Sequence, residues 1–285
     1  MKPKNVIRIL VLGDSYTEAL GVADDHTFAA LLEEKLSDIK PNGKTIEVVS
    51  ASSPGWGTDQ EFRCLQNEAM EFEPDYVLLM ACPNDIREAW CKKFAVMTNE
   101  GIKFNQIKLS RAEIFLWCLS NTSRTYQFLQ QKVFHTGYGS FAQLRSHYSF
   151  TFGRDDTNNW DRPLFLIHPF PEVDSARILF DTLIKSMHIL CKQKRIHFAV
   201  SLTPTLMEFN SGVGADTLTR SGLVSDMLHE FCQSEGIDYV DLYDHFRTSD
   251  NASSYYLSSD HHYNDKGHIL IADILSDYYR HNMGN

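Results

Sequence analysis

The sequence is short of positive charge and has no long apolar run. Its 285 residues include 27 lysines and arginines against 37 aspartates and glutamates, which gives a net charge of −10 at pH 7. This deficit argues against nucleic acid or an anionic membrane as a partner.

No segment reaches the roughly 18 consecutive apolar residues of a membrane span, and residues 6–12, which Arg8 interrupts, are too short for a signal peptide. We therefore expect a soluble protein, with the cytoplasm favoured unless an N-terminal anchor has been trimmed; the oligomeric state stays open.

Closely spaced cysteines are also missing. The six cysteines are scattered along the chain and none forms a CxxC pair, which argues against a cysteine zinc site and a thioredoxin-like motif. We interpret them as buried free thiols and leave open an oxidised Cys82–Cys91 pair. The sequence shows no internal repeat, so we expect a single domain over residues 1–285.

Short apolar segments alternate with segments in which apolar residues have helical spacing. The apolar segments predict buried strands at residues 6–12, 45–49, 75–81, 196–202 and 237–242. Helices are predicted to begin at Asp24-Asp25 and at Thr58, and to cover residues 171–191, 216–234 and 265–280. Strands separated by helices imply right-handed crossovers and a mainly parallel sheet. Because ligands of such sheets bind beyond the carboxyl ends of the strands, the turns after these strands are the places to look for chemistry.

The alternation is interrupted between about residues 88 and 171. Residues 94–104 predict a hairpin around Asn99-Glu100-Gly101. We interpret the region 88–171 as an insertion after the third strand. It either caps a pocket or forms a surface extension, and the sequence favours neither interpretation.

Three of the turns carry residues suited to stabilising an anion. Ser15 follows the first strand in Gly13-Asp14-Ser15, close to a helical segment whose backbone N–H groups point toward a bound oxyanion. Gly55, after the second strand, permits a backbone N–H to approach a substrate oxygen closely. Asn84, after the third strand, offers a side-chain N–H donor. Each of these features alone also fits an ordinary turn or helix cap.

A histidine-rich segment near the C-terminus supplies a candidate general base. Imidazole is the usual base for a serine because it titrates near neutrality, and His262 is the candidate here. Asp260, two residues earlier, is a carboxylate that can orient the ring. The competing interpretation is a metal site built from Asp260, His261, His262 and His268. Its spacing matches no zinc motif, so neither a metal nor an organic cofactor is expected.

Together the four segments resemble the sequence blocks of the GDSL/SGNH hydrolase superfamily, and their flanks are similar to those of its bacterial lipase-like branch. The blocks occur in order, with Ser15 in Gly-Asp-Ser-Tyr-Thr, Gly55 in Pro-Gly-Trp-Gly-Thr, Asn84 in Pro-Asn-Asp and His262 in His-Tyr-Asn-Asp-Lys-Gly-His. The resemblance covers residues 5–90 and 175–282. Two positions depart from the family's pattern: Cys82 replaces a glycine in the third block, and Ser259 stands where an aspartate is common.

The resemblance implies a flavodoxin-like three-layer α/β/α sandwich that works as a serine esterase. Ser15 would be the nucleophile, His262 its base, and Asp260 the residue that orients His262. The backbone N–H groups of Ser15 and Gly55 and the side chain of Asn84 would form the oxyanion hole. The substrate would be a small-molecule or glycan-linked carboxylic ester, cleaved through an acyl-enzyme on Ser15.

Two other functions stay open at this point. An O-acyltransferase would use the same acyl-enzyme and hand the acyl group to a sugar hydroxyl, and access of water to the acyl-serine decides between the two enzymes. A non-catalytic binding protein would keep the fold and lose Ser15, Asn84 or His262, yet all three are present. Trp56 and Trp90 flank the expected oxyanion loops and are candidates for the pocket wall.

Overall fold

The computed structural model describes residues 2–105, 161–210, 213–214, 217–258 and 260–283. The chain divides into two units: Met1–Trp90 together with Phe152–Asn285 forms the first, and Cys91–Thr151 the second. The residues of the four sequence blocks all belong to the first unit.

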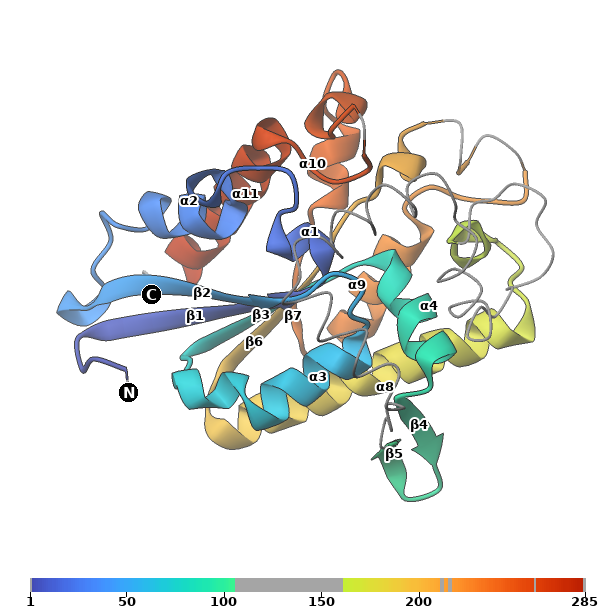
Figure 1. Ribbon diagram of the computed structural model, residues 1–285, viewed down its shortest axis with the longest axis horizontal. Coiled ribbons are helices and arrows are strands. Elements are labelled where there is room, and N and C mark those ends of the chain that lie inside the picture. The colour runs from blue at the N-terminus through green and yellow to red at the C-terminus, as the bar shows by residue number, and fades with distance from the viewer. Residues whose placement is uncertain (1, 106–160, 211–212, 215–216, 259, 284–285) are drawn as a thin grey trace, which may run out of the picture. The chain divides into compact units, whose positions relative to one another are not determined.

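The first unit contains five strands: β1 (Val6–Gly13), β2 (Thr45–Ser52), β3 (Tyr76–Ala81), β6 (His197–Leu202) and β7 (Asp238–Val240). They form one parallel sheet in the order β2-β1-β3-β6-β7 (Figure 1). These are the five strands that the apolar runs predict, with small differences at their ends. The sheet grows from β1 in both directions, which is the flavodoxin-like order.

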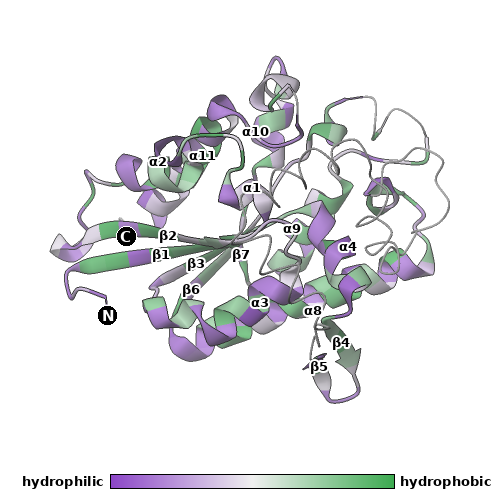
Figure 2. Cartoon of the chain, viewed as in Figure 1, coloured by the Kyte–Doolittle hydropathy of each residue, from purple (hydrophilic) through white to green (hydrophobic). Residues whose placement is uncertain are grey.

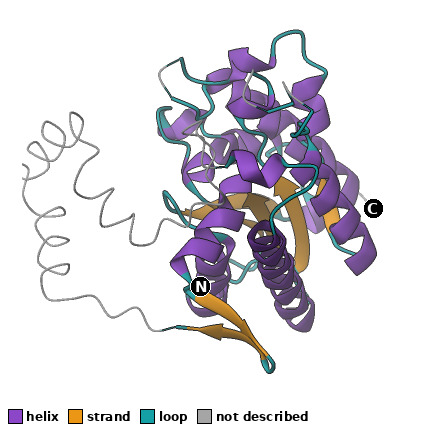
Figure 3. Ribbon diagram, turned by 90° about the vertical axis from the view of Figure 1, so that its right-hand side faces the viewer, coloured by secondary structure: helices purple, strands orange, loops and turns teal. Residues whose placement is uncertain are grey.

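Helices cover both faces of this sheet (Figures 1 and 3). On one face α2 (Phe28–Lys35) packs against α11 (Asp265–Met283), and on the other α3 (Thr58–Asn67) packs against α8 (Pro171–Lys194). The remaining helices are α1 (Ser15–Glu18), α4 (Pro83–Lys92), α9 (Leu223–Glu235) and α10 (Tyr243–Arg247). This arrangement confirms the predicted three-layer α/β/α sandwich.

The strands are hydrophobic toward both helical layers (Figure 2). Ile9 and Val11 of β1 pack in the core cluster that α2 and α11 share with the sheet. Leu10 and Leu12 are also fully buried, and they point to the opposite face because side chains alternate along a strand. The exception in this run is Arg8, whose guanidinium Nε donates a hydrogen bond to Glu47 Oε2 at the paired position of β2, at 2.7 Å.

Two helices begin later than the sequence predicts. The helix expected after Asp24-Asp25 begins at Phe28, because the Thr27 hydroxyl accepts a hydrogen bond from the Ala30 N–H and caps it. The helix expected over residues 216–234 begins at Leu223. Residues 217–222 instead contain a bend, an isolated bridge between Thr219 and Leu166, and a turn that ends at Gly222. Gly222 has a φ of 75°, and its N–H donates to the buried carboxylate of Glu208.

The described part of the second unit contains the predicted hairpin. Its strands are β4 (Ala95–Thr98) and β5 (Gly101–Phe104), which pair in antiparallel register around Asn99 and Glu100. Residues 106–160 of the expected insertion lie outside the described residues, so both interpretations of the insertion, a cap and a surface extension, stay open. Cys82 and Cys91 are both free, so the disulfide left open above is not formed. Within the described residues, no helix combines the length and the hydropathy needed to cross a membrane.

Candidate active site

The sheet brings the first three sequence blocks to one edge. Gly13, the last residue of β1, pairs with Ser52 of β2 on one side and with Met80 of β3 on the other. The turns that follow these three strands therefore start side by side. β2 lies on one side of β1 and β3 on the other. The carboxyl ends of these strands are therefore also the switch point at which α/β sheets bind ligands.

Ser15 is the first residue of α1 and is held by the residue before it. The Asp14 carboxylate caps the helix by accepting a hydrogen bond from the Tyr16 N–H at 2.9 Å. Gly13 is required for packing, because a Cβ there would lie 2.0 Å from Thr17 Oγ1. The sequence analysis gave Asp14 no role; an aspartate directly before a helix start is the signal that would have identified it as a cap.

His262 lies against Ser15 although 247 residues separate them in the chain. Its Nε2 is 2.8 Å from the Ser15 Oγ, a hydrogen-bond distance. Its Nδ1 is 2.9 Å from Asp260 Oδ1, but this approach is not aligned for a hydrogen bond, and Nδ1 has no hydrogen-bond partner among the described residues. Burial raises the pKa of Asp260, yet the charge of His262, the His261 N–H and the side-chain contact with His262 lower it more, so the net shift is downward. Asp260 and His262 are therefore in direct contact, and the charge of His262 is the largest of the lowering contributions.

The residues after His262 hold it in the loop that precedes α11. The Asn264 Oδ1 accepts hydrogen bonds from the N–H groups of Lys266 and Gly267, and its Nδ2 donates to two backbone carbonyls of the preceding loop. Gly267 is required for packing, because a Cβ there would lie 2.5 Å from the Tyr255 carbonyl oxygen. Asn264 and Gly267 of the last block thus hold the segment that carries His262.

Asn84 points toward the same edge. Its Nδ2 donates a hydrogen bond to Asp14 Oδ2 at 3.1 Å, which links the third block to the first and leaves the second N–H of the amide for another acceptor. The loop before α4 is braced by Asp85, whose Oδ2 accepts from the Cys82 N–H at 2.7 Å. Cys82 in place of the common glycine is compatible with this turn, since its φ is not positive.

The second block contributes two glycines with different requirements. Gly55 has a φ of 69°, a left-handed conformation that favours glycine, and the space around its missing Cβ is open. Gly57 has an ordinary φ of −111°, but a Cβ there would lie 2.7 Å from the backbone nitrogen of Ala89 in α4. Gly57, which the sequence analysis did not single out, therefore sets how closely the second block packs on the third.

Several carboxyl groups lie buried beneath this edge, among them those of Asp14, Glu61 and Asp85. Burial raises the pKa of each, and the mutual repulsion of the group raises the pKa of Glu61 and Asp85 further, to well above the usual range. Both oxygens of Glu61 are buried without a hydrogen-bond partner among the described residues. Burial therefore disfavours ionisation of each of these carboxyl groups. The burial of Glu61 could not be predicted from the sequence, because an acidic residue in the first turn of a helix is usually exposed to solvent.

The two tryptophans expected in the pocket wall are both partly buried. Trp56 lines a cavity of about 390 Å³ along the free edge of β2, together with Thr17, Ser52 and Phe72. Neither Ser15 nor His262 is among the residues that line this cavity. In Trp90 on α4 the indole Nε1 is buried without a partner among the described residues. Their place in the active-site wall stays a prediction.

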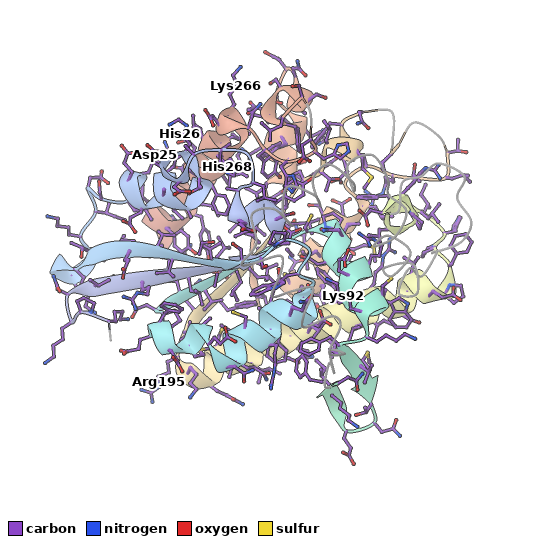
Figure 4. The ribbon with its side chains drawn as sticks, viewed as in Figure 1. Asp25, His26, Lys92, Arg195, Lys266 and His268 are labelled. Carbon is purple, nitrogen blue, oxygen red and sulfur yellow. The ribbon has the colours of Figure 1, made fainter. Side chains whose placement is uncertain are left out.

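The histidines of the competing metal interpretation do not converge. His268 is buried in the α2–α11 layer, where its ring stacks on Phe28 and its Nδ1 accepts a hydrogen bond from the Phe28 N–H (Figure 4). Burial lowers the pKa of His268 to about 4, which keeps the imidazole neutral. His261 is exposed. In the described part of the chain, no cluster of three or more histidine, cysteine, aspartate or glutamate side chains could hold a metal ion.

Comparison with known proteins agrees with this arrangement. The model of the GDSL-like lipase/acylhydrolase family matches residues 11–270. The chain belongs to this family. A catalytic triad and an oxyanion hole are expected of a GDSL-like hydrolase, and the residues predicted for these roles, Ser15, Gly55, Asn84 and His262, all lie within the matched range. No curated protein sequence matches the chain.

Solved structures share the fold at low sequence identity. A lipase/acylhydrolase from Enterococcus faecalis is 13% identical, with a TM-score of 0.50 over 97% of this chain and 96% of that one. The esterase EstA from Pseudoalteromonas sp. is 16% identical, with a TM-score of 0.50 over 98% and 99%. The acetyl xylan esterase AlAXEase is 14% identical, with a TM-score of 0.51 over 95% and 99%. At these identities the similarity establishes the fold and leaves the substrate open.

Proposed function

We propose that this GDSL-like hydrolase cleaves carboxylic esters through an acyl-enzyme on Ser15. The observation that carries the proposal is the 2.8 Å contact between the Ser15 Oγ and the His262 Nε2 at the switch point of the sheet. In this geometry His262 takes the serine proton as Oγ attacks the ester carbonyl. The protonated imidazole then gives that proton to the departing alcohol. Water, activated by His262 in the same way, releases the acid and restores Ser15.

The oxyanion formed in this attack needs hydrogen-bond donors at the edge of the sheet. The proposed donors are the backbone N–H groups of Ser15 and Gly55 and the second N–H of the Asn84 amide. The Asn84 contact with Asp14 supports this role, because it holds the amide in place before substrate arrives. Asp260 supplies negative charge beside the imidazolium that forms in the transition state.

The proposed substrate is a small-molecule or glycan-linked ester. Membership of a family of lipases and acylhydrolases supports an acyl ester, and an acetyl xylan esterase among the proteins of the same fold makes a glycan-linked acetyl group a sensible one to test. No cofactor takes part in the proposed steps, since serine, imidazole and backbone donors supply every proton transfer and charge contact.

A fluorophosphonate probe tests the nucleophile directly. We expect covalent labelling of the wild-type protein at Ser15, mapped by mass spectrometry, with no labelling of Ser15→Ala. Turnover of p-nitrophenyl acetate should fall by at least about 10³-fold in Ser15→Ala. The matched control is Ser175→Ala, because the Ser175 hydroxyl donates to the Pro171 carbonyl oxygen within the first turn of α8. Labelling at another serine, or unchanged turnover in Ser15→Ala, would refute the proposal.

A further inference from the structure

Asp260 does not fix the plane of the His262 ring. Its Oδ1 lies near Nδ1 without the alignment of a hydrogen bond, and the same oxygen accepts a hydrogen bond from the His261 N–H at 2.6 Å. The Asp260 side chain is also 50% exposed. An aspartate two residues before the base, rather than three, thus contributes charge, and one acceptor site of its Oδ1 is taken by its own loop. This leaves room for a second group to orient the imidazole.

Tyr16 contacts the His262 loop on both sides of the base. Its hydroxyl donates a hydrogen bond to the His261 carbonyl oxygen at 3.0 Å. Its ring lies against the His262 imidazole, with the centroids 4.8 Å apart, and meets the edge of the Tyr263 ring at 5.2 Å. The ring therefore limits rotation of the imidazole, and the hydroxyl holds the backbone from which His262 extends.

Both ends of this contact are anchored. Tyr16 directly follows Ser15, and its backbone N–H bonds to Asp14 in the same turn, so the backbone of Tyr16 is held together with that of the nucleophile. Tyr263 is fully buried, and its hydroxyl donates to the Pro204 carbonyl oxygen at 2.7 Å. The tyrosine thus joins two segments that are far apart in the sequence at the point where Ser15 and His262 meet.

We propose that Tyr16 is a positioning residue that sets the His262 imidazole against the Ser15 Oγ, while Asp260 contributes through its charge. This inference rests on the proposed function, in which Ser15 and His262 are nucleophile and base. Loss of proper orientation lowers the rate of the chemical step and leaves substrate binding in place, because a shift of about 1 Å at the reacting atoms can reduce the rate about 100-fold.

Two variants test the contributions of the Tyr16 hydroxyl and the Tyr16 ring separately. With p-nitrophenyl acetate as substrate, we expect Tyr16→Phe to lower kcat about 3- to 10-fold, and Tyr16→Leu, which removes the ring contact as well, to lower it about 100-fold. KM should change less than twofold in both. The matched control is Tyr278→Phe, which deletes an equivalent hydroxyl contact with Asp238 at the opposite end of the strands and should keep the wild-type kcat.

The pH profile distinguishes orientation from charge. The titratable groups that face His262 are Asp260 on its own loop, Asp14 and Tyr16 on the nucleophile turn, and His268 on α11. Burial raises the pKa of Tyr16 well above its usual value, so the phenol is neutral over the working range. Tyr16→Leu should therefore lower the plateau of kcat/KM and leave the acid limb in place. Asp260→Asn removes a negative charge and should move that limb to lower pH.

The outcomes separate this inference from the function on which it rests. A kcat of Tyr16→Phe within 1.5-fold of wild type, in a protein whose Ser15 still reacts with the fluorophosphonate, would overturn the role of Tyr16 and leave the esterase intact. An acid limb that moves in Tyr16→Leu as far as in Asp260→Asn would also overturn it. Failure of wild-type Ser15 to label would refute the esterase itself. Because Tyr16→Phe preserves the ring and its packing, the test stands even if Tyr16→Leu does not fold.

Discussion

Substitution of Gly57 by alanine tests whether close packing of the second and third blocks builds the site. At a φ of −111° alanine meets no backbone strain. Its Cβ would instead lie 2.7 Å from the Ala89 nitrogen, 3.1 Å from the Glu88 Cβ and 3.2 Å from the Asp85 carbonyl oxygen. Two of these atoms are helix backbone and cannot rotate away, so the turn and α4 must separate. Overpacking of this kind costs about 1–3 kcal/mol, and we expect about 2 kcal/mol here.

The same separation should impair catalysis. Gly55 lies in the turn that would move, and Asn84 lies in the first turn of α4. Two of the three proposed oxyanion donors would therefore move apart. Loss of one such donor typically lowers kcat about 100- to 1000-fold. A displacement of a few tenths of an ångström is a partial loss, and we expect Gly57→Ala to lower kcat about 10-fold on p-nitrophenyl acetate, with a smaller change in KM.

Gly236→Ala is the matched control. Gly236 has a φ of 66° at the end of α9, and nothing lies within 4 Å of the position of its Cβ. Alanine there should cost about 1 kcal/mol through backbone strain and leave kcat unchanged. Urea unfolding measures the stability of both variants, and initial rates measure kcat. The reasoning fails if Gly57→Ala unfolds within about 0.5 kcal/mol of wild type and retains full kcat.

Three further predictions concern stability. Burial raises the pKa of Glu208 from 4.5 to about 7. Since the pKa is higher in the folded state, the free energy of unfolding should fall by about 3 kcal/mol as the pH rises from below 4.5 to above 7. Glu208→Gln should reduce this pH dependence, as measured by urea titrations at pH 5 and pH 8. Thr27→Ala should destabilise the protein by about 1 kcal/mol through loss of the cap on α2, whereas Thr27→Ser should retain it; equal losses in the two would contradict the capping role. Leu275→Ala should cost about 2–5 kcal/mol because Leu275 is fully buried in the core cluster, while Ile269→Ala on the exposed side of the same helix should stay within about 0.5 kcal/mol.

Local pattern in the sequence predicts most of the fold and the identity of the reactive groups. Most of the strands are recognisable because burial on both faces makes them largely apolar runs. Ser15, Gly55 and Asn84 are recognisable because each follows such a run, and parallel strands bring their carboxyl ends to one edge. Where an interaction from a distant residue overrides the local pattern, prediction fails: the helix expected from residue 216 begins at Leu223 because the carboxylate of Glu208 holds the turn before it.

Only the tertiary structure decided how the base is held. The sequence places Asp260 two residues before His262, but the direction of its carboxylate depends on the fold of the loop, and in that fold Oδ1 bonds to the His261 N–H. The contact of Tyr16 with His261 and His262 joins residues about 245 positions apart, and no periodicity or spacing encodes such a pair. The sequence thus indicated the candidate reactive groups, because their chemistry and their turns are local properties. Their orientation depends on packing across the whole sandwich, and only the tertiary structure reveals it.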